Sequence, residues 1–121
     1  MKTVLVVDDE FSIAFLISTV LEDEGYRVVT AANGRMALEA LAEARPDLVI
    51  SDFMMPIMDG AAFAHALRRI AAHAQTPIII TSGLPEEALR ERFNDYKKFL
   101  RKPFFETVLL QAVSAVMKNE E

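Results

Sequence analysis

The sequence contains no cysteine, no long hydrophobic run and no excess of positive charge. The absence of cysteine excludes disulfide bonds, thiolate metal sites and thiol catalysis, and it fits a reducing, cytoplasmic setting. The first apolar run, Val4–Val7, ends at an acidic triplet and is shorter than the roughly 7–15 apolar residues of a signal peptide. No stretch approaches the ~18 apolar residues of a membrane span. The net charge of −5 argues against direct binding of nucleic acid or an anionic membrane.

The composition is that of an ordinary globular domain, with 52% hydrophobic and 26% charged residues. A chain of 121 residues is long enough to bury a hydrophobic core without disulfides or structural metals. It contains no internal linker, repeat or low-complexity tract. We therefore expect a single domain over residues 1–121.

Short apolar segments rich in β-branched residues alternate with segments of helical periodicity. The predicted strands are 4–7, 26–30, 48–50, 78–81 and 99–100. The predicted helices surround the apolar stripes 13–21 and 36–41 and cover 61–72, 86–93 and 104–117. The periodicity places Leu16 on the core face of the first helix and Ile70 on that of the third. Strict alternation of strand and helix predicts an α/β fold with a parallel sheet covered by helices on both faces. Such sheets bind ligands at the carboxyl ends of their strands.

Polar residues stand where four of these strands end: Asp8 and Asp9, then Asp52, Ser82 and Lys102. Taken singly, each side chain also suits a helix cap, a turn or a solvated lysine. Caps and turns do not require all of them to share one edge of a sheet. The combination therefore predicts one site in which three carboxylates, a hydroxyl and an ammonium group meet.

Three neighbouring carboxylates repel one another unless a cation neutralises them. Mg²⁺ (or Mn²⁺) accepts carboxylate oxygens while it keeps waters and a phosphate oxygen. With such an ion present, Asp52 is a candidate nucleophile toward a phosphoryl group, giving an aspartyl phosphate. Lys102 is a candidate partner for a phosphoryl oxygen, and Ser82 is a candidate hydrogen-bond donor to another. No histidine is placed for a zinc site.

Four motifs, at 6–10 (VVDDE), 52–60 (DFMMPIMDG), 77–83 (PIIITSG) and 102–104 (KPF), follow one another along nearly the whole chain. Together they resemble those of the response-regulator receiver domains of two-component signalling, the family that includes chemotaxis receivers. The resemblance implies a flavodoxin-like (βα)5 three-layer sandwich with sheet order 2-1-3-4-5. It also implies a phosphoacceptor that is not an enzyme beyond slow self-catalysed phosphotransfer and autodephosphorylation.

The resemblance gives each matching residue a role. The implied roles are phosphoacceptor for Asp52, metal ligands for Asp8, Asp9 and the backbone carbonyl of Met54, phosphoryl contacts for Ser82 and Lys102, and switch residues for Ser82 and Phe99. Thr81 is a competing hydroxyl, but counting from Pro77 favours Ser82. Without the resemblance, Phe99 reads as a core aromatic. The implied phosphodonor is a phosphohistidine on a sensor histidine kinase or a histidine phosphotransfer protein.

The sequence departs from the family pattern just before the fifth strand, where residues 94–98 replace small residues and the segment from Ser82 to Lys102 is short. The fourth helix, fifth strand and fifth helix form the usual output face, so the downstream effector stays open. A homodimer through that face is one expectation, because Phe105 and Val108 widen the apolar arc of the last helix.

Other apolar residues lie near the expected site. Met54 and Leu84 stand at its mouth. They are either exposed apolar residues without a role or a barrier to water that lengthens the lifetime of the aspartyl phosphate. Phe11 and Phe15 lie off the core stripe of the first helix. They either pack against the last helix or dock a phosphotransfer partner. The two histidines, His65 and His73, are expected to be solvated.

We expect a stand-alone receiver domain, and three other assignments compete with it. The chain could be the N-terminal receiver of a longer transcription factor or enzyme. A phosphohydrolase of the haloacid-dehalogenase type also uses an aspartate nucleophile and Mg²⁺, but it needs a second aspartate where this chain has Met54. A flavodoxin-like cofactor binder needs a phosphate-cradling loop after the first strand, where three acidic residues stand here.

Overall fold

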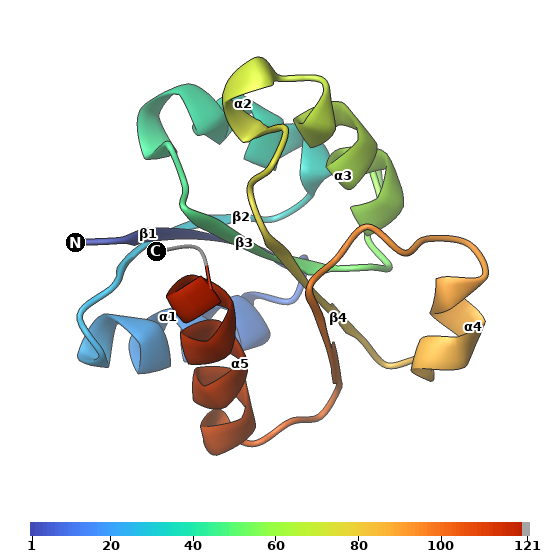
Figure 1. The fold of residues 1–121 in the computed structure, drawn as a ribbon. Coiled ribbons are helices and arrows are strands. Elements are labelled where there is room, and N and C mark those ends of the chain that lie inside the picture. Colours follow the sequence, from blue (N-terminus) through green and yellow to red (C-terminus); the bar gives the residue numbers. More distant parts are fainter. Residues whose placement is uncertain (120–121) are drawn as a thin grey trace.

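The computed structural model describes residues 1–119 and shows five parallel strands alternating with five α-helices (Figure 1). The strands are β1 (Thr3–Val7), β2 (Arg27–Ala31), β3 (Leu48–Asp52), β4 (Ile78–Ser82) and β5 (Lys98–Arg101). The helices are α1 (Phe11–Asp23), α2 (Gly34–Ala44), α3 (Gly60–Arg68), α4 (Glu86–Arg90) and α5 (Glu106–Asn119), with a 3-10 turn η1 (Ala71–His73). The order β2-β1-β3-β4-β5 confirms the predicted sheet and its flavodoxin-like class.

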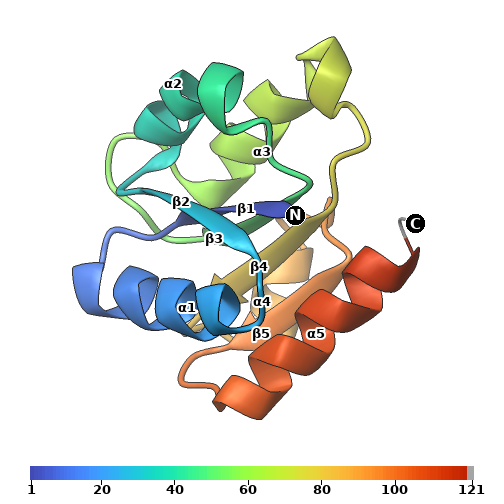
Figure 2. The same cartoon turned by 90° about the vertical axis from the view of Figure 1, so that its left-hand side faces the viewer.

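The sheet separates two hydrophobic clusters, and α1 and α5 cover one face while α2 and α3 cover the other (Figures 1 and 2). Side chains of a strand alternate between its faces. Val4 and Val6 of β1 therefore pack on the α1 and α5 side, and Leu5 and Val7 pack on the α2 and α3 side. Every residue of β1, β3 and β4 is buried. This burial explains why these strands read as continuous apolar runs.

The parallel registers bring the carboxyl ends of the central strands to one edge. Val7 pairs with Ser51, Asp52 with Thr81, and Ser82 with Arg101. The chain leaves β1 at Asp8 and β5 at Lys102. The registers thus place Asp8 and Lys102, which are 94 positions apart in the sequence, at the same edge.

Helix α3 ends at Arg68, four residues before the predicted end of the 61–72 helix. One nitrogen of Arg68, Nη1, donates hydrogen bonds to the backbone carbonyls of His73 (3.0 Å) and Thr76 (2.6 Å). These bonds stabilise the turn η1 in place of a further turn of α-helix. As a result Ile70, which the helical periodicity assigned to the core face, is 38% exposed, and Ala64 is buried instead.

The predicted bounds of the last two helices are also corrected. Helix α4 stops at Arg90 rather than residue 93, and Phe93 turns its ring toward Phe53, with 6.1 Å between the ring centroids. Helix α5 begins at Glu106 rather than residue 104, because Phe104 packs on the core cluster from the preceding loop.

Two predicted exposures are wrong. Leu16 was assigned to the core stripe of the first helix, but it is 45% exposed, and Ala14 takes part in the buried face in its place. His73 was expected to be solvated, but it is buried and its Nδ1 lies 2.9 Å from Thr76 Oγ1. In the part of the chain that the structure describes, no helix has the length and hydropathy needed to cross a membrane.

Candidate functional site

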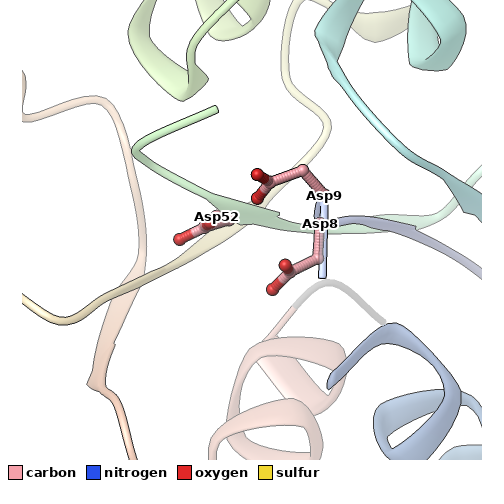
Figure 3. A group of neighbouring side chains, drawn as sticks. All are labelled: Asp8, Asp9 and Asp52. Carbon is pink, nitrogen blue, oxygen red and sulfur yellow. The ribbon is translucent and has the colours of Figure 1, made fainter. Parts of the chain in front are cut away.

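Three aspartates meet at the carboxyl edge of the sheet (Figure 3). Asp8 and Asp9 follow β1 directly, and Asp52 is the last residue of β3. One carboxylate oxygen from each lies within 4.8 Å of the others. Asp8 and Asp52 are buried and Asp9 is exposed, so the group opens to solvent on one side.

Lys102 joins this cluster from the end of β5. Its Nζ lies 2.9 Å from Asp8 Oδ2 and 3.4 Å from Asp52 Oδ1. The backbone N–H of Lys102 donates to the carbonyl of Ser82 at 2.8 Å, which fixes the lysine beside the end of β4. A third carboxylate, that of Glu10, lies 3.6 Å from the same Nζ. The sequence alone did not indicate this role for Glu10.

Burial raises the pKa of Asp52 from 3.8 to about 6, and the neighbouring charges of Asp8 and Asp9 act in the same direction, although Lys102 opposes them. For Lys102, burial disfavours the charged form, but the hydrogen bond to Asp8 and the charge of Asp52 outweigh burial and raise its pKa. The site therefore keeps the ammonium group of Lys102 charged, whereas burial and the neighbouring aspartates disfavour the charged form of Asp52.

The hydroxyl residue Ser82 lines the same cleft. Its side chain is fully buried, and its Oγ accepts a hydrogen bond from the backbone N–H of Leu84 at 3.0 Å. The cleft has a volume of about 450 Å³ and is lined by Asp9, Glu10, Asp52, Met54, Ser82, Gly83, Leu84 and Lys102. Thr81 is buried and is not part of this lining.

The loop from Phe53 to Gly60 is held tightly against the end of β3. Gly60 donates its backbone N–H to the carbonyl of Phe53 at 2.8 Å. A Cβ at Gly60 would lie 2.7 Å from the Asp52 carbonyl oxygen and 2.9 Å from Phe53 Cα, so only glycine fits there. Asp59 caps α3 through its Oδ1, which accepts from Ala62 N at 2.8 Å. The sequence signal Asp59-Gly60 thus marks a close backbone contact as well as a turn.

Phe99 lies outside the carboxylate cluster, half-buried on the α4 side of β5. It ends a chain of neighbouring rings that starts at Phe53, next to Asp52. The ring centroids are 6.1 Å apart for Phe53 and Phe93, 5.9 Å for Phe93 and Tyr96, and 6.4 Å for Tyr96 and Phe99. Sequence reasoning found Phe99 but missed Phe93 and Tyr96, whose positions depend on the short α4.

The donor set fits a hard divalent cation. Three carboxylates and one ammonium group leave two negative charges uncompensated at neutral pH, and oxygen ligands are those that Mg²⁺ prefers. Burial contributes most to the raised pKa of Asp52, and the carboxylates of Asp8 and Asp9 add to it; a cation held by these oxygens would lower that pKa. In the receiver domains that the sequence motifs resemble, acidic residues bind Mg²⁺, and this cluster has the same chemistry.

A family model and two curated proteins match this chain over most of its length. The response regulator receiver domain model matches residues 4–114. The chain is 34% identical to the PhoP transcriptional regulatory protein of Bacillus subtilis over 99% of this chain and 50% of PhoP. It is 34% identical to the protein PilG of Pseudomonas aeruginosa over 93% of this chain and 84% of PilG.

Among solved structures, the chemotaxis response regulator CheY4 of Vibrio cholerae superposes with a TM-score of 0.87 at 39% identity, covering 96% of this chain and 98% of CheY4. The chain spans about half the length of the transcriptional regulators that it matches. Receiver domains are signalling phosphoacceptors rather than conventional enzymes. On these matches and this fold, the chain belongs to the response regulator receiver domain family.

Proposed function

We propose that this chain is a phosphorylation-controlled switch of a two-component phosphorelay, in which Asp52 accepts a phosphoryl group from a phosphohistidine. The observation that carries the proposal is the environment of Asp52. This carboxylate ends a buried strand, shares a cluster with Asp8 and Asp9, and has Lys102 Nζ at 3.4 Å. Asp8 shares this burial, these acidic neighbours and Lys102, at 2.9 Å, but Asp52 lines the open cleft and Asp8 does not.

In the proposed reaction, a carboxylate oxygen of Asp52 attacks the phosphorus of the phosphohistidine. The new P–O bond forms as the P–N bond breaks, and the departing imidazole nitrogen keeps the electron pair. A Mg²⁺ (or Mn²⁺) held by Asp8, Asp9, Asp52 and the backbone carbonyl of Met54 would neutralise charge on the phosphoryl oxygens. Lys102 is placed to pair with one of those oxygens once its contact with Asp52 is exchanged.

The phosphoryl group would then act on Ser82 and Phe99. It adds ~1.5–2 negative charges and three acceptor oxygens. Ser82 Oγ lines the cleft and would donate to one oxygen. A shift from mostly inactive to mostly active needs about 5 kcal/mol, and two or three charge-assisted hydrogen bonds contribute roughly 3–9 kcal/mol together, a range that includes this value. The ring of Phe99 would follow the Ser82 loop inward, and the α4–β5–α5 face would change shape for an effector or a second copy.

The side chain of Met54 argues for a switch over a phosphohydrolase. It lines the cleft two residues after Asp52, where a hydrolase of the haloacid-dehalogenase type needs an acid–base carboxylate. A thioether cannot move a proton, so the phosphoryl group would be held rather than turned over. This supports a signalling role for the acylphosphate.

The expected partners are a sensor histidine kinase or a histidine phosphotransfer protein, in a cytoplasmic setting, with residues 1–121 as one receiver domain. The exposed pair Phe11 and Phe15 supports the partner assignment. Their side chains are 81% and 62% exposed and their rings stack with centroids 6.0 Å apart. The alternative of lateral packing against the last helix is not what the structure shows. An apolar pair one helical turn apart, beside the acidic cluster, is suited to a partner's helix.

The test is phosphorylation by acetyl phosphate with Mg²⁺, followed by intact-protein mass spectrometry. Wild type is expected to gain one phosphoryl group, and Asp52→Asn none. Asp23→Asn, at the exposed end of α1, is the matched control and should be labelled like wild type. Equal labelling of Asp52→Asn and wild type would place the phosphoacceptor elsewhere and end the proposal. A chelator should abolish labelling of both wild type and Asp23→Asn.

A further inference from the structure

A second cavity lies far from the aspartate cluster, between the end of α2 and the turn η1. Both elements lie on the same face of the sheet (Figure 1). The groove has a volume of about 530 Å³, within the range of small-molecule sites. Pro46 precedes β3 and Ala72 precedes β4, so the groove is at the amino edge of the sheet, opposite the carboxyl edge that holds Asp52.

The walls of this groove are mostly apolar. They are formed by Leu38, Leu41, Ala42, Pro46, Ile70 and Ala72. One wall of the groove is formed by residues that follow the end of α3 at Arg68, namely Ile70, Ala72 and His73. Ile70 is left 38% exposed at its rim. An apolar body bound here would cover a side chain that the fold leaves in water.

Two polar side chains line the same groove, and each has unused hydrogen-bonding capacity. His73 is 8% exposed and its Nδ1 contacts Thr76 Oγ1, while Nε2 has no partner within residues 1–119. No fully buried side-chain nitrogen or oxygen of these residues lacks a partner, so Nε2 reaches solvent through the groove. Burial and the charge of Arg68 lower the pKa of His73, which favours the neutral ring. When the Thr76 hydroxyl donates to Nδ1, Nε2 carries the hydrogen and is a donor.

The other polar side chain is Arg45, the C-cap of α2. It takes part in none of the ion pairs formed within the described residues, although the protein carries a net charge of −5. Its backbone has a φ of 45°, a left-handed conformation in which glycine is the favoured residue. An arginine in this position costs about 1 kcal/mol of strain, and it places a cation on the groove.

We propose that the groove between α2 and η1 binds a small amphipathic carboxylate. Its apolar body lies between α2 and Ile70, and its carboxylate pairs with Arg45 and accepts a hydrogen bond from His73 Nε2. Arg45 lines the groove and no carboxylate does, so the anionic end of a ligand would meet a cation there without a competing acidic side chain. The ligand site is separate from the phosphoryl site, so both can be filled at once.

The probe for the test is phenylbutyrate, an aromatic carboxylate, with the neutral phenylbutanol as its matched alcohol. Binding is followed by amide chemical shifts in the isotope-labelled full chain. Phenylbutyrate is expected to bind with a dissociation constant of about 1 mM, with shifts confined to residues 38–46 and 69–76. Phenylbutanol is expected to bind about tenfold more weakly.

Arg45→Gly removes the cation while glycine suits the φ of 45°, so the variant folds. It should weaken phenylbutyrate about tenfold and leave phenylbutanol unchanged. Ala42→Trp fills the groove from an exposed position and should abolish both. Arg27→Ala, an exposed arginine on β2, is the matched charge control and should bind like wild type. The proposal fails if no shift occurs up to about 10 mM, if acid and alcohol bind equally, or if Arg45→Gly binds the acid like wild type.

Discussion

The guanidinium of Arg68 holds the carboxylate of Asp95 through two hydrogen bonds, from Nε at 2.8 Å and from Nη2 at 3.1 Å. The remaining nitrogen, Nη1, donates to the carbonyls of His73 and Thr76. One side chain therefore connects the end of α3, the turn η1, the start of β4 and the segment before β5. This contact anchors the part of the chain in which the sequence departs most from the family pattern.

Replacement of Arg68 should destabilise the fold strongly. Arg68→Lys keeps the charge but cannot span the carboxylate and two carbonyls at once, so we expect a loss of about 2–3 kcal/mol in the free energy of unfolding. Urea denaturation followed by far-ultraviolet circular dichroism measures it. Arg69→Lys, at the neighbouring exposed position, is the control and should change stability by less than about 0.5 kcal/mol. A similar loss for both variants would show that the four hydrogen bonds contribute little.

The acidic cluster predicts a stability gain for Asp52→Asn when metal is chelated. The pKa of Asp52 is about 6 in the folded state against 3.8 as its ordinary value, so the folded protein holds this proton more tightly than the unfolded chain. The ionised carboxylate therefore destabilises the fold at pH 7, and the variant should be more stable by about 1–3 kcal/mol.

The sign of this effect fixes its pH dependence. As the pH falls from about 7 through 6 toward 3.8, wild type binds the proton and relieves the repulsion, so the difference between wild type and Asp52→Asn should shrink. Thermal unfolding in a chelating buffer across this range measures the difference. A gap that widens on acidification would contradict the raised pKa. Asp23→Asn serves as the control for loss of an exposed carboxylate.

Ile57 is a β-branched residue held with a φ of 70° and its side chain is 75% exposed. The backbone N–H of Met58 donates to the carbonyl of Pro56 at 2.7 Å across it, which closes a three-residue turn. Glycine and asparagine tolerate this conformation better than isoleucine. Ile57→Gly and Ile57→Asn should therefore stabilise the protein by about 0.5–1 kcal/mol in urea denaturation. Ile57→Val keeps the branched Cβ and should give no gain. Destabilisation by both Gly and Asn would show that the isoleucine side chain makes stabilising contacts.

The strands and the site-forming residues could be predicted because they depend on local sequence. Buried parallel strands are apolar runs, and the residues that follow them fall at one edge whatever the details of the helices. Placing Asp8, Asp52 and Lys102 at the ends of strands therefore required no knowledge of tertiary contacts.

The mistakes arose where a distant contact overrides periodicity. Arg68 ends α3 through carbonyls five and eight residues further along the chain, and helical periodicity alone does not show this. The same contact carries His73 into the interior, which composition and spacing do not reveal. Leu16 faces solvent because α1 packs through Ala14 and Ile17. The apolar pattern alone does not predict which of its residues lies at the exposed border of the buried face.

The exposed ring pair on α1 predicts a specific effect on phosphotransfer. Phe11→Ser with Phe15→Ser removes an exposed apolar surface and leaves the core intact, so labelling by acetyl phosphate should not change. Transfer from a phosphorylated histidine phosphotransfer partner should slow by about tenfold or more, because hydrophobic contacts at the centre of an interface are each worth about 1–2 kcal/mol. Phe105→Ser is the matched control, an equally exposed phenylalanine on the loop before α5. Equal slowing by both substitutions, or none by the α1 pair, would remove the docking role.

The two apolar residues at the cleft, Met54 and Leu84, predict the lifetime of the aspartyl phosphate. Both line the cavity that holds Asp52, and the Met54 side chain is 57% exposed. A polar side chain at either position would hold water near the phosphorus, whereas a thioether or an isobutyl group displaces it. Met54→Asn and Leu84→Glu should therefore speed hydrolysis by about tenfold, a change of roughly 1.4 kcal/mol in the barrier. Decay of the phosphorylated protein, followed by mass spectrometry after removal of acetyl phosphate, gives the rate. Met36→Asn, which replaces an exposed methionine outside the cleft, should decay like wild type. If wild type itself decays within seconds and the two cleft variants keep that rate, the apolar side chains do not control access of water to the acylphosphate.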